Sequence, residues 1–166
     1  MDCLYQARYI MEKAFVKLID ENQGIIYKVC KMYRNSPADQ EDLFQETVLQ
    51  LWKAFPNFRN DSKVSTWMYR IALNTAIAIF RKNKVELTFK ENLPNDSISH
   101  STDETSENEE RMFEAIRTLN QAERAIIALF LEDYPYKEIA EIIGITENNV
   151  GVKISRIKEK LKNILN

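Results

Sequence analysis

Amide and basic side chains gather near the end of the chain, in the stretch from Tyr136 to Lys162. If the residues after Thr146 form a helix, with about 100° between successive side chains, these groups lie on its outward side. Asparagine can pair bidentately with adenine, and lysine and arginine reach guanine edges or phosphates. The residues concerned are Asn148, Asn149, Lys153, Arg156 and Lys160. Their types and spacing predict a helix that reads the major groove of DNA.

Apolar residues in the same stretch indicate how this helix is positioned. Four of them fall at i, i+4, i+7 and i+11, which makes one stripe that faces a neighbouring helix. They are Val150, Ile154, Ile157 and Leu161. The preceding helix is expected to end at Gly144, and Thr146 is the expected N-cap of the next one. This pattern predicts a helix-turn-helix, although an ordinary helical hairpin with a solvated basic face has the same charge pattern.

A second group of residues has the chemistry of single-stranded nucleic acid binding. A loop rich in Asn, Asp and Ser, beginning at Asn57, leads to an expected N-cap at Ser65 and a helix with interleaved aromatic and basic residues. Bases stack on aromatic rings for about 1–3 kcal/mol each, while cations hold the phosphates. The helix carries Trp67, Tyr69, Arg70, Asn74, Arg81 and Lys82. Trp67 is also interpretable as a core residue, so Tyr69, Arg70 and the polar loop are the better candidates for contact.

A third group is acidic. A helix expected to begin near Asp39, after Pro37, places Asp42, Gln45 and Glu46 on one polar face, with Gln50 a turn further along. Paired carboxylates on a helix can bind Mg²⁺. A helical metal-dependent hydrolase using Glu41, Asp42 and Glu46 is therefore one alternative, but no second carboxylate-bearing helix obviously faces this one. We expect either a solvated face or a docking surface.

Composition limits the remaining function classes. The 166 residues include only three glycines and four prolines, and without sustained alternation they predict an all-α protein. With no apolar run of about 18 residues and no leader sequence, we expect a cytoplasmic protein without membrane insertion. Cys3, Cys30 and His100 do not have the spacing of a disulfide framework, a zinc site or a histidine-based triad. We therefore expect no cofactor, no metal and no catalytic residues.

The negative charge is concentrated in one segment. Residues 85–110 carry eight acids and one base, so that a chain of net charge −2 has a remainder of net charge +5. The same segment is rich in Ser and Thr and has no apolar periodicity, which is typical of a flexible linker. It predicts two small helical domains, residues 1–86 and 109–166, joined by an acidic linker at 87–108.

Periodicity within these domains predicts individual helices. We expect helices over Arg8–Asp20, with Ile10 and Ala14 facing inward, and over Gly24–Tyr33. Two more are expected between Arg111 and Leu131, the second starting with a capping box of Asn120 and Glu123. The expected core of this region is Ile116, Leu119, Ile126, Ile127, Phe130 and Leu131.

Two of these stretches together resemble a known family. The sequences of residues 42–53 and 58–74 look like the second region of bacterial extracytoplasmic-function (ECF) sigma factors, which belong to the sigma-70 family. The helix-turn-helix from Tyr136 onward is similar to their fourth region. The linker occupies the place of the domain that larger sigma factors carry between the two regions. The resemblance covers nearly the whole chain, and the order and separation of the two motifs make it specific.

The resemblance implies roles for particular residues. Asp42, Gln45, Glu46 and Leu49 match the helix that grips the coiled-coil of the largest subunit of core RNA polymerase. The residues that match the minus-ten contacts, around a loop that captures a flipped base, are Asn57, Arg59, Asn60, Asp61, Ser62, Lys63, Tyr69, Arg70, Asn74, Arg81 and Lys82. Those that match the minus-thirty-five contacts are Thr146, Asn148, Asn149, Lys153, Arg156 and Lys160.

The implied function is a promoter-specificity subunit that binds core RNA polymerase, through its coiled-coil and flap, and promoter DNA. An anti-sigma factor is a further expected partner. Two departures from the family pattern are Ala78, where many members carry an acid, and Gly151, inside the recognition helix. The first leaves promoter contacts near that position in doubt, and the second allows a close approach to DNA or is a tolerated weakness. A stand-alone helix-turn-helix regulator is the alternative function.

Overall fold

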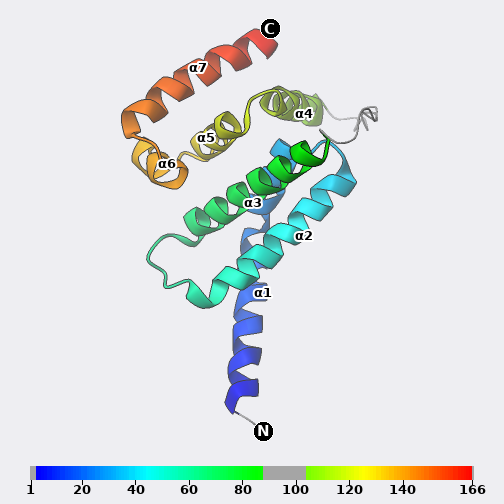
Figure 1. Cartoon of the computed structure of the whole chain (residues 1–166), viewed down its shortest axis with the longest axis vertical. Helices are drawn as coiled ribbons and strands as arrows, with labels where there is room; N and C mark the ends of the chain where they lie inside the picture. The colour runs from blue at the N-terminus through cyan, green and yellow to red at the C-terminus, as the bar shows by residue number, and fades with distance from the viewer. Residues whose placement is uncertain (1–2, 88–103, 166) are drawn as a thin grey trace.

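The computed structural model describes residues 3–87 and 104–165, and the side chains of residues 6–81 and 107–165 within them. These parts are helical, as predicted, and form two adjoining units (Figure 1). The first unit, residues 3–87, contains α1 Cys3–Tyr33, α2 Pro37–Ala54, the short 3-10 helix η1 Phe55–Asn57 and α3 Val64–Leu87. The second unit, residues 104–165, contains α4 Glu104–Arg117, α5 Gln121–Leu131, α6 Tyr136–Ile143 and α7 Glu147–Leu165. None of the described helices is long and apolar enough to cross a membrane.

The first unit is a bundle in which α1, α2 and α3 all contact one another. Its core consists of fully buried side chains from each helix, among them Ile26, Leu43, Leu51 and Met68. At one end, the Phe15 ring meets Trp52 and Phe55 edge-on, at centroid distances of 5.0 and 5.3 Å. This aromatic cluster joins α1 to the end of α2 and therefore positions the loop that follows.

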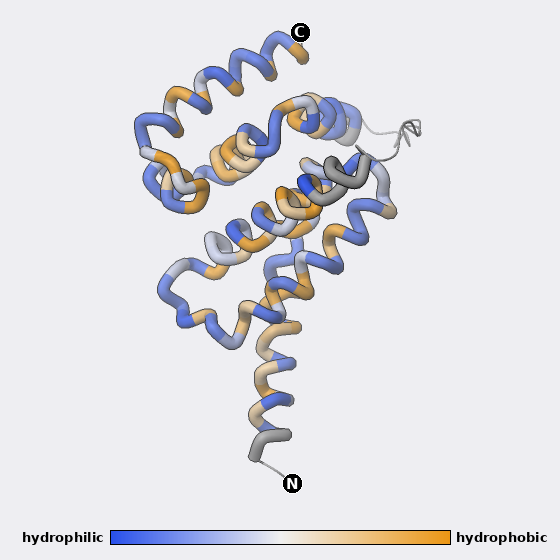
Figure 2. The backbone as a smooth tube through the Cα atoms, viewed as in Figure 1, coloured by the Kyte–Doolittle hydropathy of each residue, from blue (hydrophilic) through white to orange (hydrophobic). Residues whose placement is uncertain are grey.

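The start of the first unit differs from the prediction. The expected helices over Arg8–Asp20 and Gly24–Tyr33 are one continuous helix, α1, because Gly24 lies exposed on its surface and does not interrupt it. Ile10 and Ala14, predicted to face inward, are exposed, Ile10 to 67%. The first turns of α1 project beyond the other helices, so they have no neighbour to pack against (Figures 1 and 2).

Local sequence signals set the other helix starts of the first unit. Ser36 caps α2 by accepting a hydrogen bond from the Asp39 amide at 3.1 Å, and Pro37 occupies the first turn as predicted. The predicted start of α3 was wrong by two residues, because the helix begins at Val64 and Ser65 lies inside it rather than at its N-cap. The 3-10 helix and the loop after it occupy the space between these two starts.

The second unit follows the predicted caps closely. Asn120 and Glu123 form the capping box of α5, Gly144 ends α6 in the left-handed conformation at φ 80°, and the stripe on α7 is buried. Leu131, predicted in the core, is instead 44% exposed, since it ends α5. Helix α4 begins at Glu104, inside the expected linker, and most of that linker (88–103) lies outside the described residues.

The two units are in contact along one side of each. Helix α4 packs against α1, and α5 packs against α3. The Tyr33 hydroxyl donates a hydrogen bond to the Gln121 carbonyl at 2.9 Å, and Arg117 Nη1 donates one to the Lys31 carbonyl at 2.9 Å. Of the helices that meet here, α3 also carries residues of the predicted minus-ten set.

Candidate functional site

The end of the second unit is a helix-turn-helix made by α6 and α7. Gly144 allows the tight turn, and Thr146 Oγ1 accepts a 3.4 Å hydrogen bond from the Asn149 amide at the start of α7. The four residues of the predicted stripe are all buried. Packing of this stripe fixes the rotation of α7 about its own axis, and with it the side chains that face outward.

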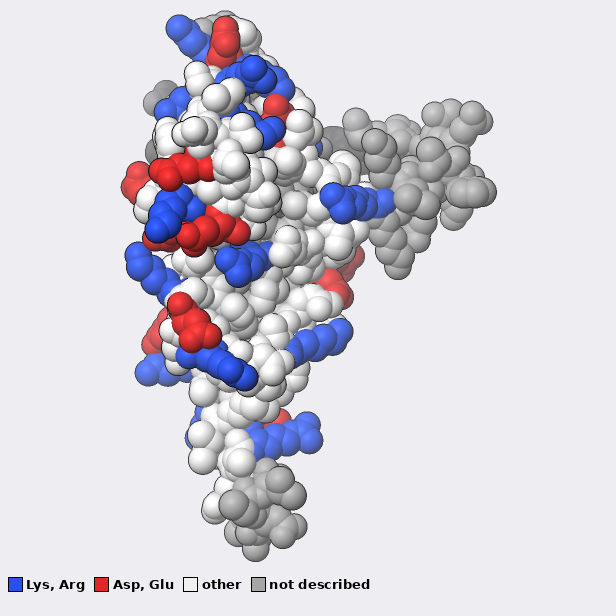
Figure 3. Space-filling model, turned by 60° about the vertical axis from the view of Figure 1, so that its left-hand side comes forward, with Lys and Arg blue, Asp and Glu red and all other residues white. Residues whose placement is uncertain are grey.

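The outward side of α7 carries most of the predicted DNA-reading residues. Asn148, Asn149, Lys153 and Arg156 are exposed, as is Thr146 at the turn. In the space-filling view, the upper end of the molecule, which contains α7, shows more basic than acidic side chains (Figure 3). The structure therefore brings these five residues onto one accessible end of the molecule.

Lys160 differs from the rest of this set, because it forms an ion pair with Glu123 of α5. Glu123 also accepts a 3.2 Å hydrogen bond from the Asn120 amide in the capping box. Partial burial tends to raise the pKa of Glu123, but the bonds from Lys160 and Asn120 lower it overall. Lys160 thus fastens α7 to α5, a role that helical periodicity alone does not reveal.

Gly151 faces α6 rather than the outward side of α7. A Cβ atom added at this position would lie 3.4 Å from Tyr136 Cε2 and 3.8 Å from its Cδ2. The glycine therefore gives room to an aromatic ring at the start of α6. This is a packing reason for a residue that the sequence pattern left with two explanations.

The loop between η1 and α3 presents the polar residues predicted to contact the minus-ten element. Phe58 stacks on Trp67 at a centroid distance of 4.5 Å and an interplanar angle of 28°, which anchors the start of the loop. Asn60 adopts a left-handed conformation at φ 58°. The exposed residues are Asn57, Arg59, Asn60, Asp61, Ser62 and Lys63. Trp67 is half-buried beneath them, consistent with its interpretation as part of the core.

Helix α3 continues from this loop, and its predicted contacts divide between two faces. Arg70, Asn74 and Arg81 are exposed, whereas Tyr69 is only 2% exposed. The Tyr69 ring meets Tyr134 of the second unit edge-on at 5.7 Å, so its prediction as a surface contact is wrong for this arrangement. Burial, and next the nearby Glu132 carboxylate, raise the pKa of Tyr69. The Lys82 side chain lies outside the described residues.

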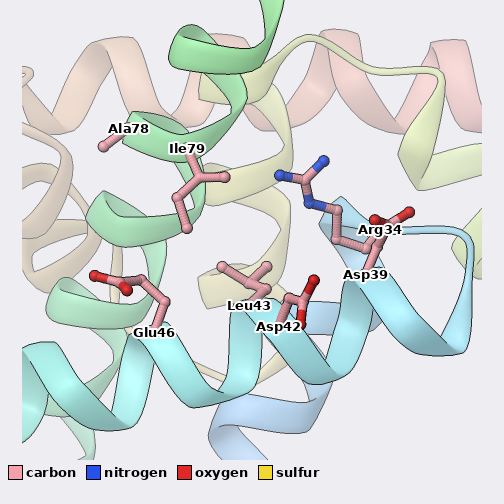
Figure 4. A pocket seen from close by; sticks show the side chains of 7 residues that line it. All are labelled: Arg34, Asp39, Asp42, Leu43, Glu46, Ala78 and Ile79. Carbon is pink, nitrogen blue, oxygen red and sulfur yellow. The ribbon is translucent and has the colours of Figure 1, made fainter.

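The acidic face of α2 borders a hollow of about 540 Å³. Leu43 points from α2 toward Ile79 on α3 and forms its apolar floor, with Glu46 and Asp42 on either side of Leu43 (Figure 4). Gln50 Nε2 donates a 2.7 Å hydrogen bond to Glu46. Gln45 and Leu49 are exposed on the same helix. The arrangement is an open groove with a carboxylate rim, suited to a partner that offers cations beside apolar groups.

Several groove residues were missed in the sequence. Arg34, Asp39 and Ile79 line it, but they lie directly after α1, on α2 and on α3, and no local pattern reveals how these elements pack. Ala78 also lines it, on the side of Glu46 (Figure 4). An acid at this position would face the groove, so the departure at Ala78 concerns the groove rather than the minus-ten loop. Among the described residues, no group of three or more His, Cys, Asp or Glu side chains could hold a metal ion.

Comparison with known proteins matches both units to one family. Residues 18–85 match Sigma-70 region 2, and residues 109–161 match Sigma-70, region 4. An ECF RNA polymerase sigma-E factor of Haemophilus influenzae is 32% identical over 166 residues, covering 92% of this chain and 87% of the relative. The ECF RNA polymerase sigma factor SigW of Bacillus subtilis is 27% identical over 165 residues, covering 91% of this chain and 88% of the relative.

Solved structures show the same fold. The sigma factor RpoE of Bartonella quintana, in complex with the anti-sigma factor NepR, matches with a TM-score of 0.79 at 21% identity, covering 92% of this chain and 97% of that one. CnrH, in complex with the cytosolic domain of CnrY, matches with a TM-score of 0.64 at 19% identity, covering 93% and 88%.

Proposed function

The chain belongs to the sigma-70 family of RNA polymerase sigma factors, in its ECF group, and from this premise we propose how its two units divide promoter recognition. It directs core RNA polymerase to specific promoters and takes part in transcription initiation. We assign polymerase docking and the minus-ten element to the first unit, and the minus-thirty-five element to the second. The protein acts in the cytoplasm, beside the polymerase and the promoter, and catalyses no reaction itself.

The observation that carries this division is the separation of three surfaces of different chemistry. Carboxylates rim the groove on α2, an exposed polar loop stands on a stacked aromatic pair, and amide and basic residues face outward from α7. An acidic surface repels DNA, whereas the basic and amide surface attracts it. The three surfaces therefore fit one protein partner and two DNA elements.

We assign the α2 surface to the coiled-coil of the polymerase's largest subunit. Asp42 and Glu46 lie at the groove, while the apolar side chain of Leu49 is exposed beside Gln45 on the same helix. An exposed leucine bordered by carboxylates favours a helix with basic residues around an apolar contact. Reversing the two charges would replace attraction with repulsion.

We assign the loop after η1 to capture of a flipped minus-ten base. Extruding a base costs a few kcal/mol, so the receiving site must already be shaped. The Phe58 and Trp67 stack and the left-handed Asn60 fix the loop at two points, with Arg59 and Lys63 exposed on it. Arg70, Asn74 and Arg81 on α3 extend this surface toward the phosphates.

We assign base reading in the minus-thirty-five element to the first turns of α7. Asn148 and Asn149 are exposed at the N-terminal end of α7, which we expect to enter the major groove of the DNA. Lys153 and Arg156 follow a turn or more further along the helix. Thr146 lies where a phosphate would meet the helix N-terminus. We expect Lys160 to contribute least to DNA binding among these residues, since it already forms an ion pair with Glu123.

An anti-sigma factor is a further proposed partner. Both solved structures above contain a partner protein: the sigma factor RpoE is bound to the anti-sigma factor NepR, and CnrH is bound to the cytosolic domain of CnrY. A partner of this kind would have to cover at least one of the three surfaces to block initiation. Of the three surfaces, the acidic groove is the hollowed one, and an open groove suits a helix.

The test is run-off transcription with purified core polymerase on fragments of the source genome. Asp42→Arg with Glu46→Arg is compared with Asn148→Ala with Arg156→Ala, and with wild type. The first variant should lose both core binding and transcripts, and the second should lose transcripts while still binding core polymerase. A matched control, Asp20→Arg with Glu21→Arg, changes two exposed acids of α1 and should behave as wild type.

Two outcomes would contradict the proposal. If wild type neither binds core polymerase nor starts a transcript, the assignment of the groove fails. Specific DNA binding in the absence of core polymerase, together with that result, would favour the stand-alone regulator instead.

A further inference from the structure

The first turns of α1 stand apart from the bundle and expose apolar side chains. They project beyond the other helices of the first unit (Figures 1 and 2), and Ile10 on them is 67% exposed. They precede residue 18, where the match to Sigma-70 region 2 begins, and contribute no residue to the three assigned surfaces. An uncovered apolar face on a projecting helix indicates a surface that another element covers.

Four apolar residues form one row along this part of α1, at i, i+4, i+7 and i+11. This apolar row consists of Ala7, Met11, Ala14 and Leu18. Both alanines are exposed and the two larger side chains are half-buried. Leu18 packs against the core, so the row runs from the projecting turns to the level at which the bundle begins. Ile10 lies along one edge of the row and widens it.

The charged side chains around the apolar row are balanced and paired within the helix. Arg8 Nε lies 3.0 Å from Glu12 Oε1, and Lys17 Nζ lies 3.7 Å from Glu21 Oε1. Residues 6–21 contain three bases and three acids, and therefore carry no net charge. Long-range electrostatic attraction thus favours neither nucleic acid nor a strongly charged protein as the partner of this surface.

The apolar row is complementary to itself when the helix direction is reversed. Its residues are alternately small and large along the chain, from Ala7 and Met11 to Ala14 and Leu18. An antiparallel copy places Leu18 opposite Ala7 and Met11 opposite Ala14, so that every large side chain faces a small one. A parallel copy in the same register places large against large and alanine against alanine. Alternation of sizes across facing positions allows two helices to interdigitate, which favours the antiparallel pair.

The charges at the two ends of the row also favour the antiparallel pair. Helix α1 begins at Cys3, and the start of a helix carries the positive end of its dipole. When Ala7 lies opposite Leu18, this start lies beside Asp20 and Glu21 of the other copy, which are both exposed. The contact is made twice, because a two-fold axis relates the two copies.

From these observations we propose that the apolar row of α1 is a dimerisation surface, on which a second copy of this chain packs antiparallel. The row is about 17 Å long, at 1.5 Å for each helical residue. An interface of this length is small, so the dimer is weak and forms at micromolar or higher concentrations. The proposal is independent of the proposed promoter function, because it uses no residue of the polymerase or DNA surfaces.

Sedimentation velocity of the full-length protein from about 2 to about 200 µM tests the association. The weight-average sedimentation coefficient of wild type should rise with concentration. Ala14→Glu places a carboxylate in the middle of the row and should weaken the dimer at least about tenfold, because each copy then brings an unpaired charge into an apolar contact. Ala14 is exposed and glutamate is a good helix former, so the bundle should stay folded.

Val16→Glu is the matched control, because it adds the same charge to the same helix on the side that faces away from the row. Val16 is 56% exposed, and the variant should dimerise as wild type does. A wild type that is monomeric at every concentration, or an equal loss in both variants, would overturn the proposal. If wild type is monomeric and Ala14→Glu alone loses core polymerase binding, the polymerase covers the row and the proposal is also wrong.

Disulfide cross-linking tests the direction of the two helices. The chains carry Cys3→Ser, and Cys30 is kept, since it is buried and burial raises the pKa of its thiol to about 12. Under a mild oxidant, Ala7→Cys chains should cross-link to Leu18→Cys chains. They should not cross-link to each other, because identical positions lie about 16 Å apart along an antiparallel pair. A higher yield between two Ala7→Cys chains than in the mixture would show a parallel pair and overturn the proposed arrangement.

Discussion

The three α-helices of the first unit have 31, 18 and 24 residues, whereas three of the four helices of the second unit are shorter, with 14, 11 and 8 residues, and the fourth, α7, has 19. Short helices are marginal alone, so their ends matter more. In the second unit a capping box and a left-handed glycine close those ends. Both units combine packing with local caps, Ser36 on α2 being one in the first unit, but the second depends more on its caps because three of its helices are short.

The same contrast extends to the functional surfaces. In the second unit, the reading residues lie on a single helix whose rotation is fixed by its own buried stripe. In the first unit, the groove and the loop require three helices to be placed correctly relative to one another. A change in the core of the first unit should therefore damage its surfaces more than a comparable change at a helix end.

The largest expected effect comes from the core of the first unit. Leu51 is fully buried, and Leu51→Ala should lower the free energy of unfolding by about 2–5 kcal/mol, because it removes apolar contacts and leaves a cavity. Both tryptophans, Trp52 and Trp67, belong to the first unit. Urea unfolding followed by tryptophan fluorescence reports this unit alone, whereas circular dichroism reports both.

Ile126→Ala is the counterpart in the second unit, where Ile126 is equally buried. It should shift the circular dichroism transition and leave the fluorescence transition nearly unchanged. If each substitution instead moves both transitions together, the two units unfold as one body and the contrast between them does not extend to stability.

Substitution of alanine for glycine should change the free energy of unfolding in opposite directions at two positions. Gly144 has φ 80°, so Gly144→Ala should destabilise the second unit by about 1–2 kcal/mol. Gly24 lies within α1 with open space around it, so Gly24→Ala should stabilise the first unit by about 0.5–1 kcal/mol. The midpoints of urea unfolding, compared at an unchanged denaturant dependence, measure both changes in stability. If both substitutions stabilise or both destabilise the protein, the explanation from backbone conformation is wrong.

These glycines also show what could be predicted from the sequence. Gly144, Asn120 and Glu123 act through their own neighbours along the chain, and the structure confirms the ends that they predict. Gly24 follows the same local rules but does not end a helix, because packing of α1 on α2 and α3 outweighs the cost of one exposed glycine. Local signals were sufficient where a cap is present and insufficient where only packing decides.

The candidate site divides in the same way. The outward residues of α7 were predictable, because one stripe determines one face. The burial of Tyr69 was not, since Tyr134, 65 positions further along the chain, covers it. The pairing of Lys160 with Glu123 and the placement of Ala78 in the groove also depend on contacts between helices. Periodicity shows which residues share a face but does not show which other element covers it.

A smaller effect, dependent on pH, is expected at Glu123. Its pKa is lowered in the folded protein, so its contribution is fully present above its ordinary pKa near 4.5 and is lost as the pH falls below that value. Glu123→Gln keeps an acceptor for the capping box but removes the charge that binds Lys160. We expect a loss of about 0.2–1 kcal/mol at pH 7, the range for a partly exposed ion pair, that becomes smaller as the pH falls below 4.5.

Urea unfolding of wild type and Glu123→Gln at a series of pH values measures this difference. Asp20→Asn, at an exposed acid of the first unit, is the control and should show no such trend. A constant difference between wild type and Glu123→Gln from pH 7 to pH 3 would mean that the ion pair with Lys160 does not stabilise the second unit.

The smallest expected effect is at Gly151, where two explanations for the glycine predict different results. Replacing glycine within a helix usually gains about 0.5–1 kcal/mol. The new Cβ atom in Gly151→Ala would lie 3.4 Å from Tyr136, so that ring must move slightly and part of the gain is lost. We therefore expect a net stabilisation of a few tenths of a kcal/mol, with unchanged affinity for promoter DNA in the holoenzyme.

The neighbouring residue provides the matched control. Val152 is half-exposed on the outward side of α7, so Val152→Ala should change DNA affinity more than stability. Opposite behaviour at these adjacent positions is expected because one faces α6 and the other faces outward. If Gly151→Ala instead weakens DNA binding while it stabilises the fold, the glycine serves a close approach of DNA, and the contact with Tyr136 is secondary.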